Sequence, residues 1–156
     1  MNLKAALVLW FVALGLAIPA HSQQISFSEF AGYWSGSADG EVSSGKRERL
    51  RCTTNNSLKD GGSLRMVLRC ANATGVSLQI YATIAQSAGK VSGTWEERTY
   101  NISGTVSGSM TTSALKARVH SPNFKASISV QRTGSTLNVS VIPSEGTGKF
   151  TVDMSR

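Results

Sequence analysis

The stretch KRERLRCTTNNSLKDGGSLRMVLRC, residues 46–70, decides the fold. Apolar and polar side chains alternate on both sides of its Asp-Gly-Gly centre, which is the period of a β-strand with one buried face. One face of the first half carries Leu50 and Cys52, and one face of the second half carries Leu64, Met66, Leu68 and Cys70. The stretch therefore predicts a β-hairpin that turns at residues 60–62.

The turn and the two cysteines predict the same strand register. A turn centred on Gly61 pairs residues whose numbers sum to 122, and Cys52 and Cys70 form such a pair. We expect a disulfide between them, which stabilises the fold by roughly 3 kcal/mol, chiefly through the unfolded chain. Metal binding is the alternative, but two thiols and the one histidine that follows residue 22, His120, make a poor ligand set.

This register also sorts the charged residues of the hairpin. Five arginines fall on its outward face: Arg47, Arg49, Arg51, Arg65 and Arg69. Glu48 falls on the inward face, close to the start of its strand, which predicts a position at a rim of the sheet. The arginine face favours contact with an anionic surface, with ordinary surface solubility as the alternative.

The rest of the chain continues the pattern with short alternating segments separated by turn residues, such as Ser87-Ala88-Gly89 and Ser121-Pro122-Asn123. We predict an all-β fold, a single antiparallel β-barrel of about 8–10 strands, with a β-sandwich as the alternative. Residues 26–32, SFSEFAG, predict one short helical turn, with Ser26 or Ser28 as its cap and Gly32 as its end.

Residues 1–22 are typical of a signal peptide. Lys4 precedes an uncharged apolar run of 14 residues, Ala5–Ile18, and Ala20-His21-Ser22 predicts cleavage after Ser22. A membrane-spanning helix needs about 20 apolar residues, so an uncleaved anchor is the less favoured alternative. We expect residues 23–156 to form one domain, in the periplasm or secreted, without a transmembrane segment after cleavage.

The net charge of +7 becomes +6 without Lys4. A basic exported protein meets anionic lipids, acidic polysaccharides or nucleic acids. Nucleic acid is not expected as a partner, because outward aromatic side chains interleaved with the arginine ribbon are lacking.

Residues 91–110, VSGTWEERTYNISGTVSGSM, repeat a Ser-Gly phrase three times. Val91, Gly93 and Trp95 share one face, and the alternation changes parity before Ile102, so a turn lies between them. We interpret residues 96–98, Glu-Glu-Arg, as a solvated hairpin tip. Glycines inside strands are tolerated where a sheet bends tightly or a large neighbour fills the space, so the repeat indicates curvature.

Gly32-Tyr33-Trp34 resembles the Gly-x-Trp that opens the first strand of calycin-type barrels, such as lipocalins, avidins and fatty-acid-binding proteins. The resemblance implies that the tryptophan closes one barrel end and that the barrel holds a small, mostly apolar ligand. The wider phrasing, with Glu-Arg-x-Arg-Cys, Leu-Arg-Cys and Ser-Gly-x-Trp-x-Glu, resembles small exported bacterial proteins of unassigned function and implies no activity.

Six residues are candidates for lining a ligand-binding mouth: Tyr33, Trp34, Glu48, Trp95, Glu97 and Tyr100. Nothing in the sequence places Glu48 near Glu97, as a glycosidase pair requires. The sequence has no nucleophile elbow, phosphate loop, metal-ligand spacing or dinucleotide fingerprint. We therefore expect no enzyme activity, no cofactor and no metal.

Three functions fit these features. The first is a module that binds a small apolar or amphipathic ligand. The second is a cell-envelope protein that contacts anionic surfaces through the arginine face. The third is a secreted inhibitor of a hydrolase, since small disulfide-stapled barrels suit that role.

Overall fold

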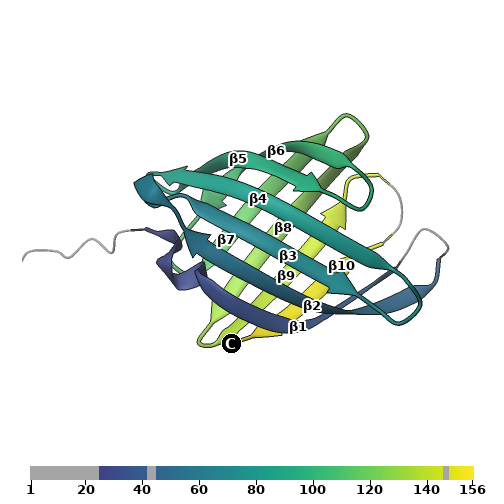
Figure 1. Cartoon of the computed structure of the whole chain (residues 1–156). Coiled ribbons are helices and arrows are strands. Elements are labelled where there is room, and N and C mark those ends of the chain that lie inside the picture. Colours follow the sequence, from purple (N-terminus) through teal and green to yellow (C-terminus); the bar gives the residue numbers. More distant parts are fainter. Residues whose placement is uncertain (1–24, 42–44, 146–147) are drawn as a thin grey trace, which may run out of the picture.

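Ten antiparallel strands close into one barrel in the computed structural model, which describes residues 25–41, 45–145 and 148–156 (Figure 1). The strand order around the barrel is β1-β10-β9-β8-β7-β6-β5-β4-β3-β2. In chain order the elements are η1 (Phe27–Phe30), β1 (Gly32–Glu41), β2 (Arg47–Leu58), η2 (Asp60–Gly62), β3 (Leu64–Ala71), β4 (Ser77–Ser87), β5 (Lys90–Glu97), β6 (Ile102–Met110), β7 (Ala114–Ser121), β8 (Phe124–Thr133), β9 (Thr136–Pro143) and β10 (Phe150–Ser155).

The predicted barrel is confirmed, and the sandwich alternative is wrong. β1 pairs with β2 on one side and with β10 on the other, so the sheet closes on itself. The predicted signal peptide, residues 1–22, lies outside the described residues. Within the described ranges, no helix combines the length and apolar character that a membrane crossing requires.

Alternation along each strand builds the barrel interior. In β7 the buried residues are Leu115, Ala117, Val119 and Ser121, and the residues between them are exposed. The same pattern in the other strands gathers the buried apolar side chains into one cluster. The strands thus turn a mainly apolar face to the interior and a mainly polar face to the outside, with Thr54, Asn56 and Glu97 as buried polar exceptions.

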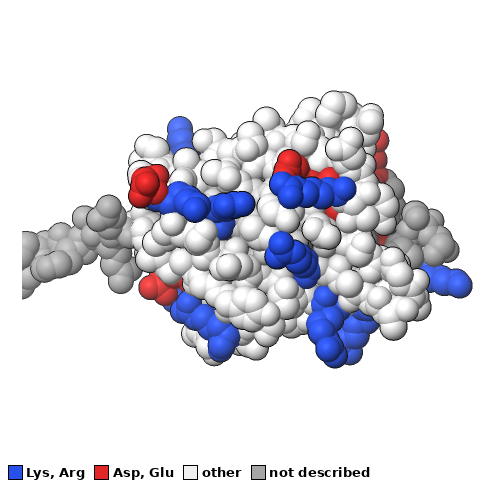
Figure 2. All heavy atoms as spheres, viewed as in Figure 1, with Lys and Arg blue, Asp and Glu red and all other residues white. Residues whose placement is uncertain are grey.

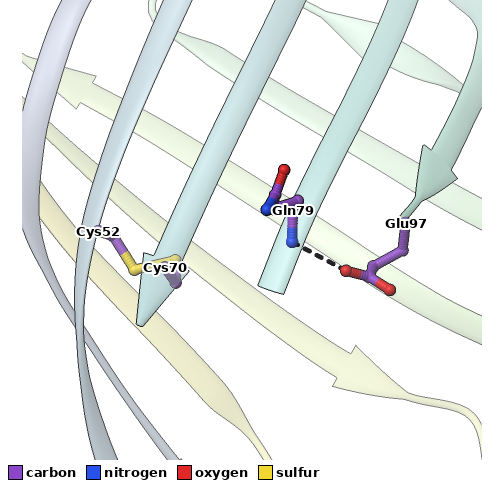
Figure 3. Close-up of a disulfide and its surroundings, with 4 residues drawn as sticks. All are labelled: Cys52, Cys70, Gln79 and Glu97. Atoms are coloured by element: carbon purple, nitrogen blue, oxygen red, sulfur yellow. Dashed lines mark hydrogen bonds between the residues drawn. A yellow bond between two sulfur atoms is a disulfide. The ribbon is translucent and has the colours of Figure 1, made fainter. Parts of the chain in front are cut away.

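The predicted hairpin register is confirmed. Cys52 lies opposite Cys70 in the β2–β3 ladder, and the two form a disulfide (Figure 3). At the turn, the Lys59 amide donates to the Ser63 carbonyl oxygen at 2.8 Å, and Gly61 has a positive φ of 77°. The outward positions of this hairpin include the five arginines, and all five are exposed.

The predicted helical turn is present as η1, a 3₁₀ helix. Ser26 caps it, because the Ser26 hydroxyl accepts a hydrogen bond from the Ser28 amide at 3.3 Å. A salt bridge of 2.7 Å between Glu29 and Arg132 ties η1 to β8. Phe27 and Phe30 are buried, so this turn packs into the barrel rather than lying on it.

Two glycines of the Ser-Gly repeat lie where neighbouring strands approach closely. A Cβ atom at Gly93 would meet the carbonyl oxygen of Thr83, and one at Gly104 would meet that of His120. These contacts are with backbone atoms, which cannot move aside as a flexible side chain does. The interpretation of the repeat as a curvature signal agrees with this close packing.

We predict that Gly104→Ala destabilises the barrel by about 1–3 kcal/mol, because the added methyl group overpacks against the β7 backbone. Ser103→Ala, at an exposed position on the same strand, is the matched control and is expected to change stability by less than about 0.5 kcal/mol. Urea unfolding followed by circular dichroism measures both. Equal stability of the two variants would contradict the role assigned to Gly104.

Candidate ligand-binding end of the barrel

The two ends of the barrel differ in how they are filled. At the end where β1 begins, η1 packs against the barrel and Trp34 is fully buried (Figure 1). Other residues of this layer are also buried: Leu64, Val91, Met110, Leu115, Leu137 and Met154. We call this the plugged end.

η1 and Trp34, which fill the plugged end, are held by polar contacts around the Phe30 carbonyl oxygen. It accepts hydrogen bonds from Trp34 Nε1 at 3.2 Å and from Asn56 Nδ2 at 2.9 Å. The Arg156 guanidinium lies 4.5 Å from the centre of the Trp34 ring and donates to the Ala31 carbonyl oxygen. The implication that a tryptophan closes one barrel end therefore holds for Trp34.

At the opposite end several inward-facing apolar side chains are only half-buried. They include Leu78, Ile80, Ile102, Phe124, Val141 and Phe150. Their alternation with outward residues places them on the same face as buried residues of their own strands, such as Ala82 in β4 and Val106 in β6. We call this the ligand end, since its inner wall offers apolar surface that is not fully packed.

Trp95 lies inside the barrel toward the ligand end. Its ring meets the Phe124 ring edge-on, with centroids 5.9 Å apart and an interplanar angle of 67°. The residue is 8% exposed, and its buried Nε1 donor has no hydrogen-bond partner among the described residues. A buried donor without an acceptor costs about 1–3 kcal/mol, so this atom is a strong candidate for contact with a ligand.

Glu97 ends β5 at the ligand end and is 4% exposed. Its carboxylate accepts a hydrogen bond from the Gln79 amide at 2.8 Å (Figure 3). It also accepts from the amides of Thr99 at 3.0 Å and Tyr100 at 2.6 Å. Burial alone raises the pKa of Glu97, but these amide donors outweigh it and hold the pKa below its ordinary value of 4.5.

The interpretation of residues 96–98 as a solvated tip is thus wrong for Glu97. β5 continues through this residue, and its carboxylate organises the turn into β6 instead of facing water. Arg98 does lie at the surface and pairs with Glu96 at 2.7 Å. The sequence pattern predicts the turn, but it does not predict that the Glu97 carboxylate accepts hydrogen bonds from backbone amides of the turn.

Glu48 lies near the start of β2, half-buried at the ligand end, as predicted. Its Oε2 accepts a hydrogen bond from Asn72 Nδ2 at 2.8 Å. Asn72 also organises the β3–β4 turn, because its Oδ1 accepts from the amides of Thr74 and Val76. Glu48 is therefore a rim residue that a ligand's polar end would meet.

The structure does not bring all six predicted mouth residues together. Trp34 lies at the plugged end, away from Trp95 and Glu97. Tyr33 and Tyr100 are 60% and 63% exposed, so their side chains face away from the interior. Phe124 was missed as a site residue, because no sequence pattern brings β8 next to the Trp95 side chain.

Titratable side chains do not gather into a metal site in the part of the chain that the structure describes, where no three of His, Cys, Asp and Glu come together. His120 lies exposed on the outward face of β7. The Cys52–Cys70 disulfide indicates folding in an oxidising, non-cytoplasmic environment.

Several solved structures superpose on this chain and share its barrel fold. A crystal structure of Rv2717c from M. tuberculosis superposes with a TM-score of 0.68 and 13% identity, covering 83% of this chain and 94% of that one. The S-type phycobiliprotein lyase CPES from Guillardia theta gives 0.56 and 9%, covering 83% and 87%. A redesigned β-barrel, mFAP1, bound to DFHBI, gives 0.51 and 12%, covering 85% and 100%.

These similarities, at 9–13% identity, show the fold alone, a β-barrel. The sequence matches no family model and no curated protein. The prediction that the chain is not an enzyme is wrong. Enzyme activity is not excluded by this fold, because one of the similar barrels is a phycobiliprotein lyase. A small barrel without a recognised catalytic motif is therefore compatible with catalysis.

We predict that Glu97→Gln lowers the free energy of unfolding at pH 7 by about 1.5–3 kcal/mol, because an amide cannot replace a carboxylate that accepts several hydrogen bonds. The lowered pKa of Glu97 means that its contribution is complete above pH 4.5 and is lost as the pH falls through its folded-state value. The difference between wild type and variant is thus expected to shrink on acidification.

Urea unfolding between pH 3 and pH 7 measures this difference. Glu96→Gln, which changes the neighbouring exposed carboxylate, is the control and is expected to leave the unfolding midpoint nearly unchanged. A constant difference across the pH range would contradict the role of the Glu97 carboxylate.

Proposed function

We propose that this chain is an exported barrel that binds a small, mostly apolar ligand inside the ligand end. The observation that carries the proposal is the buried Trp95 Nε1 donor, which has no acceptor in the part of the chain that the structure describes and lies toward the end with half-buried apolar side chains. Ligand sites commonly combine apolar walls with a few placed polar groups. Catalysis on such a ligand is compatible with the proposal.

The chemistry of the ligand end narrows the ligand class. An acceptor such as a carbonyl or ether oxygen would satisfy Trp95 Nε1, while an alkyl or aryl body would cover Leu78, Ile80 and Ile102. Glu48 at the rim disfavours an acidic group at the outer end of the ligand. The best fit is a neutral or cationic amphipathic molecule with one buried oxygen.

Similar barrels support this proposal without naming the ligand. The redesigned barrel mFAP1 has a small molecule, DFHBI, bound to it. The likeness concerns the fold alone, so ligand identity rests on the residues of this chain. The hydrolase-inhibitor hypothesis stays a prediction from size and charge.

We predict that the purified protein takes up the neutral fluorescent probe N-phenyl-1-naphthylamine and that 2-undecanone displaces it. Trp95→Phe removes the N–H but keeps an aromatic ring. The affinity for 2-undecanone is therefore expected to fall roughly two- to tenfold, which corresponds to the loss of one hydrogen bond. Binding of the probe itself is expected to change less than twofold. Probe titration followed by competition gives both affinities.

Tyr100→Phe, an exposed change at the same end, is the control and is expected to leave both affinities unchanged. Failure of the wild-type protein to bind the probe would count against an accessible interior. Equal affinity of wild type and Trp95→Phe for 2-undecanone would count against Trp95 as the anchor.

Export belongs to the same proposal, with residues 1–22 removed after Ser22. We predict that protein purified from the envelope fraction of its own cells begins at Gln23 and is two hydrogen atoms lighter than its reduced form. Intact-mass spectrometry before and after reduction measures both features. A chain that retains residues 1–22 would contradict cleavage, and an unchanged mass on reduction would contradict the disulfide.

A further inference from the structure

Two of the hollows on the outer wall of the barrel share Arg69 as a lining residue. The larger, of about 860 Å³, is lined by Arg49, Arg51 and Arg69 among other residues. The smaller, of about 440 Å³, is lined by Arg65, Arg69 and Arg98 among others. The two hollows lie side by side across β2, β3 and β4 on the outside of the barrel and share Arg69, and we call them together the arginine groove.

Tyr81 holds two of these arginines in place. The Arg98 guanidinium lies 3.8 Å from the centre of the Tyr81 ring, and Arg69 Nη2 donates to the Tyr81 hydroxyl at 3.2 Å. Cation–π contact and hydrogen bonding restrict side chains that otherwise move freely in water. A pre-ordered guanidinium loses less conformational freedom when an anion binds, so this arrangement differs from a solvated charged surface.

Three of the five arginines of the groove have no carboxylate partner among the described residues, so their positive charges are not neutralised by ion pairs. Arg49 pairs with Asp39 at 3.6 Å, and Arg98 pairs with Glu96 at 2.7 Å. Arg51, Arg65 and Arg69 have no carboxylate within 4.0 Å among the described residues. Figure 2 shows basic side chains spread over this face with few acidic ones between them.

The lining of the groove favours a sugar chain over other polyanions. Hydroxyl and amide side chains stand between the arginines, among them Thr53, Asn55, Ser57 and Gln79. Such groups match sugar hydroxyls, while guanidinium forks match carboxylate and sulfate groups.

Membranes and nucleic acids fit this surface less well. The exposed large apolar side chains of the described residues, Tyr33, Leu58, Tyr100 and Ile142, line neither hollow, so the groove has no anchor for a bilayer. Nucleic-acid bases need free aromatic faces, whereas Arg98 lies over the face of Tyr81.

We infer that the arginine groove is a binding site for a linear acidic polysaccharide, separate from the ligand end inside the barrel. Arg51 and Arg69 contact its anionic groups, and Tyr81 is a positioning residue for Arg69 and Arg98. The site differs from the predicted arginine face, because Arg47 lines neither hollow and Arg98 was not among the predicted residues.

Binding to heparin, a linear sulfated polysaccharide, tests this site at near-physiological salt. Arg51→Gln/Arg69→Gln is expected to weaken heparin binding at least fivefold. Lys90→Gln/Lys125→Gln is the matched control, because it removes the same charge from exposed positions on β5 and β8 that line neither hollow, and it is expected to weaken binding less than twofold. Tyr81→Phe keeps the net charge and is expected to weaken binding roughly two- to threefold.

Thermal unfolding of each variant checks that the barrel is intact. Equal losses for the two double variants would overturn the site, because net charge alone would then explain binding. Oligothymidylate or phosphatidylglycerol vesicles that bind as tightly as heparin, with the same loss in Arg51→Gln/Arg69→Gln, would overturn the polysaccharide assignment. Weak binding of both competitors, with loss confined to the groove variants, supports it.

Discussion

Closure of the sheet is the constraint on which the rest of this structure depends. β1 is hydrogen-bonded to both β2 and β10, so the ten strands leave no open edge in the ring. Closure requires tight coiling, and the strands approach so closely at Gly93 and Gly104 that a Cβ atom would meet a neighbouring carbonyl oxygen. It also divides every strand into an inner and an outer face, and these two faces carry the two binding surfaces proposed for the protein.

The inner face is uneven along the barrel axis. At one end η1 and Trp34 fill the interior. The Phe30 carbonyl oxygen accepts hydrogen bonds from Trp34 Nε1 and Asn56 Nδ2, which are buried there. At the other end several apolar residues of the wall are half-buried, and the Trp95 donor has no acceptor within residues 25–41, 45–145 and 148–156. Buried donors are usually paired in protein interiors. At the plugged end Arg132 Nε also lacks a partner among the described residues, but the same guanidinium pairs with Glu29. The Trp95 indole has only the one donor, so we assign the ligand to the end that holds Trp95.

Local pattern predicted the fold well. Alternation gave the strands, and the Asp-Gly-Gly turn with Cys52 and Cys70 gave the hairpin register, because both depend on residues close in the chain. The site was less predictable, because Trp95 meets Phe124 across strands distant in sequence and Trp34 lies at the opposite end. Glu97 illustrates the same limit: its amide partners include Gln79, which lies 18 residues away. The Arg98–Tyr81 contact likewise depends on strand pairing that the sequence does not specify.

The central claim is that one barrel end is plugged while the other takes an apolar ligand. Methyl NMR of protein labelled at Leu, Ile and Val, titrated with 2-undecanone, tests it most directly. Shifts are expected at Leu78, Ile80 and Ile102, with little change at Leu64, Leu115 and Leu137 at the plugged end. Shifts centred on the plugged end or on the exposed Ile142 of the outer wall, or no shifts at all, would contradict it.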